Sequence, residues 1–435
     1  MTHKIGIRHE DKYLMERRVA IIPKHVKRLR SEYGLEFLVQ RSEKRVFTEA
    51  EYLEAGARIV DNLDEAGVIF GVKEMPLDFF ENGKTYVFFS HVIKGQPYNM
   101  PMLRKMMEKK VNLIDYEKIE DDQGRRLIFF GRFAGLAGMI NSLWSLGQRW
   151  SRLGIETPFR KIRQAHTYHS LEEAMDVIRL VGEEIKESGL PDEVCPVTVG
   201  FTGYGNVSGG AQEIFGLLPH KEIKPADLAM LNPEPNESKH TLYKTVFHEK
   251  DMATPKDPEA TFDLQDYYNN PDNYRGIFEQ YLPHLTLLMN CMYWDDRYPR
   301  IVTKDYLEVL FSNGTPKLTV IGDITCDPDG SVECTHKGTL IEDPVFVYNP
   351  LTRKPTMGFD GEGLLVMAVD ILPSELPRDA SISFSNALYE FVPAIAQADY
   401  SKSYSELELP SPIKRALILH KGELTPSYRY LTNHL

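Results

Sequence analysis

The first 115 residues alternate between short apolar runs and segments whose apolar residues recur every three or four positions. The short runs predict strands at residues 4–7, 36–40, 68–72, 84–89 and 111–115. Between the early runs, amphipathic spacing predicts helices at residues 24–33 and 49–55. Because strands that alternate with helices are typical of a parallel sheet, we expect an α/β fold.

A second series of elements follows a long apolar segment that opens at Gly131 and reaches about Leu153. Its small residues predict a long helix that packs closely against neighbouring backbone and bridges to a second domain. Further strands are expected at residues 197–203, 318–324 and 364–370, with helices at residues 211–217 and after residues 376–381. Residues 219–275 are rich in Pro, Asn, Asp, Tyr and His without clear periodicity, and favour an elaborated loop or lid.

The chain has 435 residues, more than a single hydrophobic core usually serves. We therefore predict two Rossmann-like α/β domains, each with a parallel sheet flanked by helices, separated by a cleft. Residues 1–135 and 378–435 are expected to form a substrate-binding and catalytic domain. Residues 136–377 are expected to form a dinucleotide-binding domain.

Charge and hydropathy exclude two classes of partner. A net charge of −12 argues against a nucleic-acid surface, which requires clustered Lys and Arg to neutralise phosphates. The basic clusters at residues 24–30 and 104–110 contain apolar residues at helical spacing, so we interpret them as wet faces of amphipathic helices. The most apolar run, residues 364–372, is interrupted by Asp370, and we expect no membrane-spanning segment.

Cysteine and histidine spacing indicates no metal site. The cysteines at positions 195, 291, 326 and 334 form no CxxC or other zinc spacing, which favours a reducing compartment. His166 and His169 lack further ligands at suitable spacing, and no GxSxG motif predicts a covalent acyl intermediate. The sequence runs from Met1 directly into the strand-like residues 5–7, so we expect no targeting peptide and a cytoplasmic location.

A glycine-rich turn follows the β-branched run at residues 197–203 and precedes a predicted helix. This order of strand, turn and helix predicts a dinucleotide site in which backbone N–H groups receive the phosphates. Ser208 stands where the GxGxxG pattern has its third glycine, so the fit is to GxGxxxG. The candidate cofactor-binding residues of this turn are Gly203, Gly205, Asn206, Val207, Ser208 and Gly209.

The choice between NAD and NADP depends on the residue near the adenosine ribose. The acidic residue that holds a ribose 2′-hydroxyl, about 20 positions after the turn, is not obvious in this sequence. The polar cluster at residues 220–224 mixes Lys221 and Lys224 with Glu222. Because the two lysines suit a 2′-phosphate, NADP is favoured and NAD is the alternative.

Lys73 and His91 lie just past two apolar runs that predict buried strands, where an open α/β sheet presents its chemistry. Each has an ordinary alternative, as a surface lysine and as a core histidine. With Glu74 beside Lys73 and Glu117 after the strand at residues 111–115, they form a set of titratable groups able to tune one another. We therefore expect a proton-transfer site.

Charged residues also crowd the loop after the first strand. Arg18 is a candidate for bidentate capture of a substrate carboxylate, because a guanidinium matches that geometry. The alternative is a solvated charge run. The residues concerned are Arg8, Glu10, Lys12, Glu16, Arg17 and Arg18.

Motifs spread over nearly the whole chain resemble one family, the lysine-forming saccharopine dehydrogenases. The chain resembles in particular the lysine-ketoglutarate reductase domain of α-aminoadipic semialdehyde synthase, and the family's relatives include alanine dehydrogenase and the nucleotide-binding subunit of transhydrogenase. The matching motifs are at residues 7–12, 16–18, 89–101, 113–117, 134–139, 200–208, 210–215, 293–294, 370 and 372–373.

The resemblance implies reductive condensation of L-lysine with 2-oxoglutarate to saccharopine by a nicotinamide hydride. It implies that Lys73 and His91 are the acid-base pair and that Glu74 and Glu117 modulate their pKa values. It also implies that Arg18 and Gln96 bind substrate and that Asp370 lies near the cofactor.

Two departures from the family pattern qualify this implication. Ile371 follows Asp370 where the family suggests a polar residue. The chain also ends at Leu435, so we expect either a free-standing reductase or an excised domain, whose further partner is a second copy or a separate saccharopine-oxidising domain. The alternatives are an enzyme that reduces a different imine, an amino-acid dehydrogenase, and a non-catalytic nucleotide-sensing module.

Overall fold

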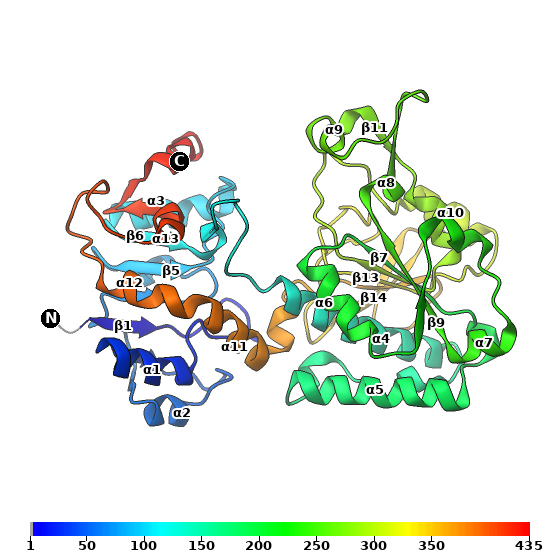
Figure 1. Cartoon of the computed structure of the whole chain (residues 1–435), viewed down its shortest axis with the longest axis horizontal. Coiled ribbons are helices and arrows are strands. Elements are labelled where there is room, and N and C mark those ends of the chain that lie inside the picture. The colour runs from blue at the N-terminus through cyan, green and yellow to red at the C-terminus, as the bar shows by residue number, and fades with distance from the viewer. Residues whose placement is uncertain (1–2) are drawn as a thin grey trace. The chain divides into compact units, whose positions relative to one another are not determined.

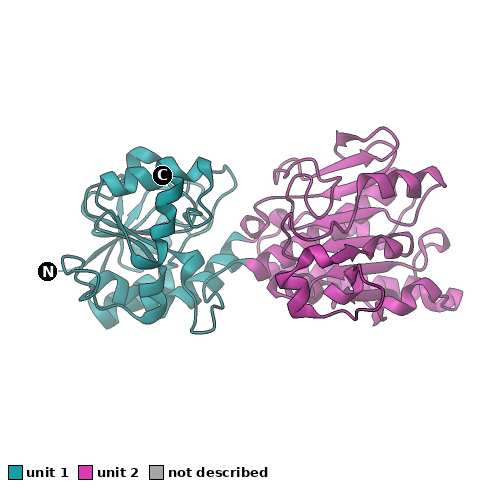
Figure 2. Cartoon of the chain, turned by 90° about the horizontal axis from the view of Figure 1, so that it is seen from above, with its two compact units in different colours: residues 1–130, 377–435 teal, residues 131–376 magenta. Residues whose placement is uncertain are grey.

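The computed structural model describes residues 3–435, which form two compact units (Figure 2). Unit 1 comprises residues 1–130 and 377–435, and unit 2 comprises residues 131–376. Unit 2 is therefore an insertion between two parts of unit 1. The assignment of substrate to one unit and of cofactor to the other stays a prediction.

Unit 1 is built on an eight-stranded sheet with helices on its faces (Figure 1). Its strand order is β3-β2-β1-β4-β5-β6-β17-β18; all neighbours from β3 to β6 are parallel, and β17 and β18 are added antiparallel. The strands are β1 (Lys4–Ile7), β2 (Glu36–Gln40), β3 (Arg58–Val60), β4 (Val68–Phe70), β5 (Thr85–Phe88), β6 (Asn112–Asp115), β17 (Leu417–His420) and β18 (Glu423–Leu424). The helices are α1 (Pro23–Tyr33), α2 (Glu49–Glu54), α3 (Met100–Glu108), α11 (Pro377–Leu388), α12 (Val392–Gln397) and α13 (Ser411–Ala416).

Local sequence signals set the element ends in unit 1. Helix α1 has Pro23 in its first turn and ends at Gly34, whose φ of 67° is the left-handed conformation that glycine adopts without strain. Helix α2 begins with a capping box between Thr48 and Glu51. Strands β4, β5 and β6 are buried along their whole length, as parallel strands covered on both faces must be.

Unit 2 has a second eight-stranded sheet, of order β15-β14-β16-β13-β12-β7-β9-β8. Neighbours from β16 to β8 are parallel, and β14 and β15 are antiparallel. The strands are β7 (Thr198–Thr202), β8 (His220–Glu222), β9 (Leu242–Phe247), β12 (Leu287–Asn290), β13 (Val320–Asp323), β14 (Val345–Asn349), β15 (Lys354–Met357) and β16 (Leu364–Met367). The helices are α4 (Gly131–Arg152), α5 (Leu171–Ser188), α6 (Asn206–Phe215), α7 (Pro235–His240), α8 (Glu249–Met252), α9 (Leu264–Asn269) and α10 (Lys304–Ser312).

Helices α4 and α6 pack backbone to backbone. A Cβ atom on Gly135 of α4 would overlap the carbonyl oxygen of Val207, and one on Gly210 of α6 would overlap that of Arg132. A Cβ atom on Gly209 would meet nothing within 4 Å. The close helix packing that a dinucleotide fold requires of its third glycine is therefore provided by Gly210, and the GxGxxxG alignment that ended at Gly209 is corrected.

Two expectations about element bounds are also corrected. Helix α6 begins at Asn206 rather than Ala211, so Ser208 and Gly209 belong to its first turn. Residues 219–275 are not only a loop, because they contribute β8 and β9 to the main sheet. The rest of this segment carries a small hairpin of β10 (Ala253–Pro255) and β11 (Tyr274–Gly276), on an aromatic cluster that includes Tyr267.

The predicted fold class is confirmed, with mixed rather than purely parallel sheets, because antiparallel strands extend one edge of each. The four cysteines are free. From residue 3 to residue 435, no helix is long and apolar enough to cross a bilayer, and no cluster of three His, Cys, Asp or Glu side chains is placed to hold a metal ion.

Candidate active site

Lys73, Glu74 and His91 lie beyond the carboxyl ends of the neighbouring strands β4 and β5. His91 Nδ1 is 2.8 Å from Glu74 Oε1, and Lys12 Nζ is 2.8 Å from the same oxygen. His91 has a φ of 52°, a conformation rare for a residue with a side chain, and the Asn99 side-chain amide donates to its carbonyl oxygen at 2.9 Å. The structure thus joins the predicted His91 and Glu74 directly and adds Lys12.

The pKa of Glu74 determines which atom donates in the hydrogen bond between His91 and Glu74. Burial alone would raise the pKa of Glu74, but the hydrogen bond and charge of His91, together with Lys12, outweigh it and lower that pKa to about 2. Glu74 is therefore an acceptor-only carboxylate at neutral pH. Because a carboxylate only accepts, the Nδ1–H of His91 is the donor in this hydrogen bond, and Nε2 is the ring atom that Glu74 does not bind.

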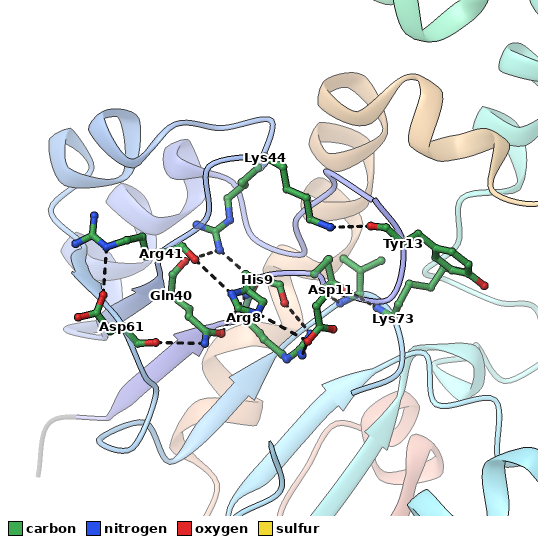
Figure 3. A network of polar contacts seen from close by, with 12 residues as sticks. Arg8, His9, Asp11, Tyr13, Gln40, Arg41, Lys44, Asp61 and Lys73 are labelled. Atoms are coloured by element: carbon green, nitrogen blue, oxygen red, sulfur yellow. Dashed lines mark hydrogen bonds and ion pairs between the residues drawn. The ribbon is translucent and has the colours of Figure 1, made fainter. Parts of the chain in front are cut away.

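Lys73 is positioned by Glu10, which reaches across from the loop after β1. The carboxylate of Glu10 accepts the backbone N–H groups of Val72 and Lys73 at 2.8 and 2.9 Å. The Lys73 ammonium lies 5.8 Å from the centre of the Tyr13 ring, and Figure 3 shows the two side chains beside this loop. The loop that follows the first strand therefore contributes to the site that the later strands carry.

Four of the charged residues of that loop are buried, so the alternative of a solvated charge run is wrong for these four. Arg18 and Glu16 are 4% and 1% exposed, and Arg18 donates from Nε at 2.8 Å and from Nη2 at 2.5 Å to the two oxygens of Glu16. Arg8 and Glu10 are also buried. Because Glu16 holds two nitrogens of Arg18, the binding of a substrate carboxylate by Arg18 stays a prediction.

The pKa values of the buried Glu10 and Glu16 shift in opposite directions. Burial and the nearby charge of Glu16 raise the pKa of Glu10 to about 7. Burial also acts to raise the pKa of Glu16, but Arg18 and, more weakly, Lys73 reverse the effect and lower it. The site therefore combines a fixed carboxylate at Glu16 with a carboxyl group at Glu10 that titrates near neutral pH.

The remaining predicted residues of unit 1 lie further from the pair. Glu117 is buried and binds Arg126, while its N–H donates to Asp115 at 2.8 Å. Asp115 also accepts the Ser90 N–H at 3.1 Å, directly before His91, and burial raises its pKa. Gln96 is exposed and accepts the Tyr98 hydroxyl at 2.9 Å. Substrate binding by Gln96 and pKa modulation by Glu117 stay predictions.

Sequence reasoning missed the direct partners of the pair. The sequence indicates Lys12 and Glu10 only as members of a charged run, and it predicts no role for Tyr13 or Asp115. Asp115 could have been found, because it ends a predicted strand as the other site residues do. Glu10 could not, because its partners lie 62 and 63 residues away and no spacing rule connects them.

The glycine turn in unit 2 joins β7 to α6. Gly203 has a φ of 78°, as the tight turn requires, and a Cβ atom on Gly205 would meet nothing within 4 Å. Gly205 is the N-cap of α6 and provides no side-chain cap to the helix. Asn206 and Val207 begin the helix, while Ser208 is buried and accepts from Gln212 at 2.9 Å. Open space and uncapped N–H groups fit a dinucleotide pyrophosphate.

A cavity of about 450 Å³ opens beside this turn. Its walls come from the turn, from the segment after β9, from the aromatic cluster and from the segment after β12. They comprise Gly203, Tyr204, Gly205, Glu249, Met252, Tyr267, Tyr268, Cys291, Met292, Tyr293 and Tyr298. A cavity of this size with aromatic walls fits the adenosine half of a nicotinamide dinucleotide.

Two other candidates in unit 2 are not among the residues that line this cavity. Asp370 is exposed after β16, with its N–H donating to Thr339 at 3.2 Å, while Ile371 is 7% exposed, which accounts for an apolar residue there. Lys221 lies on the edge strand β8 and pairs with Glu237 at 2.8 Å. The prediction of NADP depends on Lys221 and Lys224. Strand β8, which carries Lys221, is separated by β9 from β7, the strand that leads into the glycine turn. The choice between NAD and NADP therefore stays a prediction.

Comparison with known proteins identifies relatives along the whole chain. The chain is 40% identical to an α-aminoadipic semialdehyde synthase of Arabidopsis thaliana over 98% of its own length and 41% of that protein. It is 34% identical to the mitochondrial α-aminoadipic semialdehyde synthase of Mus musculus, over 99% of its length and 48% of that protein. The chain thus spans less than half the length of these relatives.

Another relative matches over most of its own length. The chain is 26% identical to a saccharopine dehydrogenase [NAD(+), L-lysine-forming] of Yarrowia lipolytica, over 91% of this chain and 93% of that protein. The family described as alanine dehydrogenase/PNT, N-terminal domain, matches residues 6–137.

Solved structures show the same fold. An L-alanine dehydrogenase covers 99% of both chains with a TM-score of 0.62 at 17% identity, and a transhydrogenase from Sinorhizobium meliloti has a TM-score of 0.57 at 14% identity. The chain is therefore similar, over nearly its whole length, to α-aminoadipic semialdehyde synthases and L-lysine-forming saccharopine dehydrogenases, and it has the alanine dehydrogenase-like fold.

Proposed function

We propose that this chain is a lysine-ketoglutarate reductase, which condenses L-lysine with 2-oxoglutarate and reduces the imine to saccharopine. The observation that carries the proposal is the chain of contacts from Lys12 through Glu74 to His91, beside Lys73, in a chain similar to these enzymes over nearly its whole length. Imine chemistry at neutral pH needs one group that accepts a proton and one that donates it. The site supplies both.

His91 is the proposed group for the condensation. With Nδ1–H held by Glu74, its Nε2 takes a proton from the lysine ε-amine as nitrogen attacks the ketone carbon. The resulting imidazolium is stabilised by the Glu74 carboxylate. It returns this proton to the former ketone oxygen, which becomes the carbinolamine hydroxyl. His91 then takes the second proton from the nitrogen and gives it to that hydroxyl, which leaves as water when the imine forms.

Lys73 is the proposed group for the imine nitrogen. Its ammonium stabilises the substrate near that nitrogen and exchanges a proton with it, while Glu10 holds the Lys73 backbone in place. A nicotinamide dinucleotide is the implied cofactor class, and when bound at the unit 2 turn it supplies the hydride that reduces the imine carbon. We also propose that Asp370 lies near the bound cofactor.

Cofactor oxidation with lysine and 2-oxoglutarate, added singly and together, tests the proposal. We expect absorbance at 340 nm to fall only when both are present, with saccharopine identified by mass spectrometry. Oxidation with ammonia and a keto acid alone would instead identify an amino-acid dehydrogenase. Cofactor binding without any turnover would indicate a nucleotide-sensing module.

Location and assembly belong to the same proposal. A cytoplasmic location is expected from the sequence, whereas the name of the mouse relative states that it is mitochondrial. A homo-oligomer or a separate saccharopine-oxidising domain is the proposed further partner. Size-exclusion chromatography with light scattering measures the first directly.

A further inference from the structure

Residues 91–96, which we call the His91 loop, have an unusual backbone conformation. His91 has a φ of 52° and Gly95 has a φ of 64°, so the chain enters the left-handed region twice within this loop. This region is disfavoured for a residue with a Cβ atom, so contacts from the surrounding structure must hold His91 there. The Asn99 side-chain amide supplies one such contact, at the His91 carbonyl oxygen.

The last turns of the chain, a 3₁₀ helix over Pro426–His434, hold the middle of the His91 loop. The Tyr430 hydroxyl donates to the Ile93 carbonyl oxygen at 2.6 Å, although Tyr430 lies 337 residues later in the sequence. The His434 ring packs on Gly95, because a Cβ atom on that glycine would lie 2.5 to 2.6 Å from three atoms of the imidazole. The loop therefore has two contacts with the C-terminal segment.

This C-terminal segment is itself fixed in the core of unit 1. Leu431 is fully buried, and Tyr428 is buried with its hydroxyl donating to the Arg415 carbonyl oxygen at 2.7 Å. Tyr430 and His434 are exposed by comparison. Because these two side chains add little to the core, their contacts with the His91 loop are their main contribution to the structure.

We propose that Tyr430 and His434 are positioning residues for His91, an inference that rests on the proposed function. They act through the backbone of the His91 loop rather than on the reacting atoms. By restricting this loop, they keep the His91 ring bonded to the Glu74 carboxylate, the geometry that proton transfer requires. Without them the loop samples more conformations, and a smaller fraction of molecules is ready to react.

Hydrogen–deuterium exchange of the whole chain, measured by mass spectrometry without substrate, tests the loop contacts. In a double variant that combines Tyr430→Phe with His434→Ala, amide exchange in residues 92–96 should be about fivefold faster or more, with exchange in unit 2 unchanged. The value of kcat/KM for lysine and 2-oxoglutarate should fall by about tenfold, mainly through kcat. Dinucleotide affinity should stay at the wild-type value.

Two further variants separate positioning from the general loss of a hydrogen bond and from acid-base chemistry. Tyr389→Phe removes a hydroxyl bond of 2.5 Å to Glu32, in unit 1 and outside the His91 loop, and should leave loop exchange and kcat unchanged. His434→Phe keeps an aromatic ring against Gly95 but cannot titrate in this pH range. It should keep the wild-type kcat and the wild-type pH profile of kcat.

The outcomes separate this inference from the proposed function. Unchanged loop exchange in the double variant, or faster exchange with an unchanged kcat/KM, would overturn the inference. A changed pH profile in His434→Phe would make His434 a proton-transfer group and would also overturn a positioning role. Faster exchange in a protein that does not turn over lysine with 2-oxoglutarate would support the loop contacts and remove the proposed function.

Discussion

The loops after the first strand of each sheet show how one scaffold provides two kinds of site. In unit 1, β1 is followed by buried charges, in which Glu16 binds Arg18 and Glu10 binds the loop after β4. In unit 2, β7 is followed by Gly203 in a tight turn and by Gly205, with open space where a side chain of Gly205 would lie. The loop after β1 is therefore filled with paired charged side chains, whereas the turn after β7 leaves room for the phosphates of a ligand.

The second strand of each sheet shows a further difference. In unit 1 the chain returns directly beside the first strand, so β2 pairs with β1. In unit 2 it goes to the edge strand β8, and β9 then fills the place beside β7. Residues after the strand in this place therefore come much later in the sequence of unit 2, as the cavity-lining Glu249 does.

Two adjacent glycines test whether open space or close packing explains the unit 2 turn, and they carry the largest expected effect. Gly210→Ala places a Cβ atom against the Arg132 carbonyl, so we expect a loss of about 3 kcal/mol or more in the free energy of unfolding. Gly209→Ala meets no atom and should change it by no more than about 1 kcal/mol, in the stabilising direction. Urea denaturation measures both, and equal effects would refute the packing role of Gly210.

The acid-base residues test the unit 1 half of the comparison. Lys73→Met and His91→Gln should each lower kcat by about 10²-fold or more with little change in cofactor affinity, because general acid-base catalysis is lost. Lys94→Met, at an exposed lysine of the same loop as His91, is the matched control and should keep its rate. Steady-state kinetics measures kcat, and wild-type rates in both variants would exclude the pair from the mechanism.

The turn itself gives a smaller and more selective effect. Gly205→Val fills open space without meeting another atom, so stability should stay near the wild-type value while dinucleotide affinity falls by about tenfold or more. The dinucleotide affinity of Gly205→Ala should lie between those of the wild-type protein and Gly205→Val. Unchanged affinity in the valine variant, measured by fluorescence titration, would place the pyrophosphate elsewhere.

The sequence predicted those features that depend on neighbouring residues. The bounds of β1 and β2 agree with the apolar runs, and Lys73 and His91 could be located because each follows a predicted strand. Strand β17 was not predicted, because it pairs with β6 about 300 residues earlier. Strand β9 was hidden in a segment whose composition resembles a loop, and with it the position of Glu249.

The smallest expected effect concerns Glu10, the carboxyl group that distinguishes the filled loop of unit 1. Its pKa is raised to about 7 by burial and by Glu16, so the folded protein holds this proton more tightly than the unfolded chain. Stability from this group is complete below the ordinary pKa of 4.5 and is lost as the pH rises toward 7. Between pH 5.5 and 6.5 the wild-type protein should therefore lose about 1 kcal/mol relative to Glu10→Gln, which cannot titrate. Urea midpoints of both proteins across this pH range measure the difference. If the two midpoints change in parallel with pH, Glu10 does not titrate in this range.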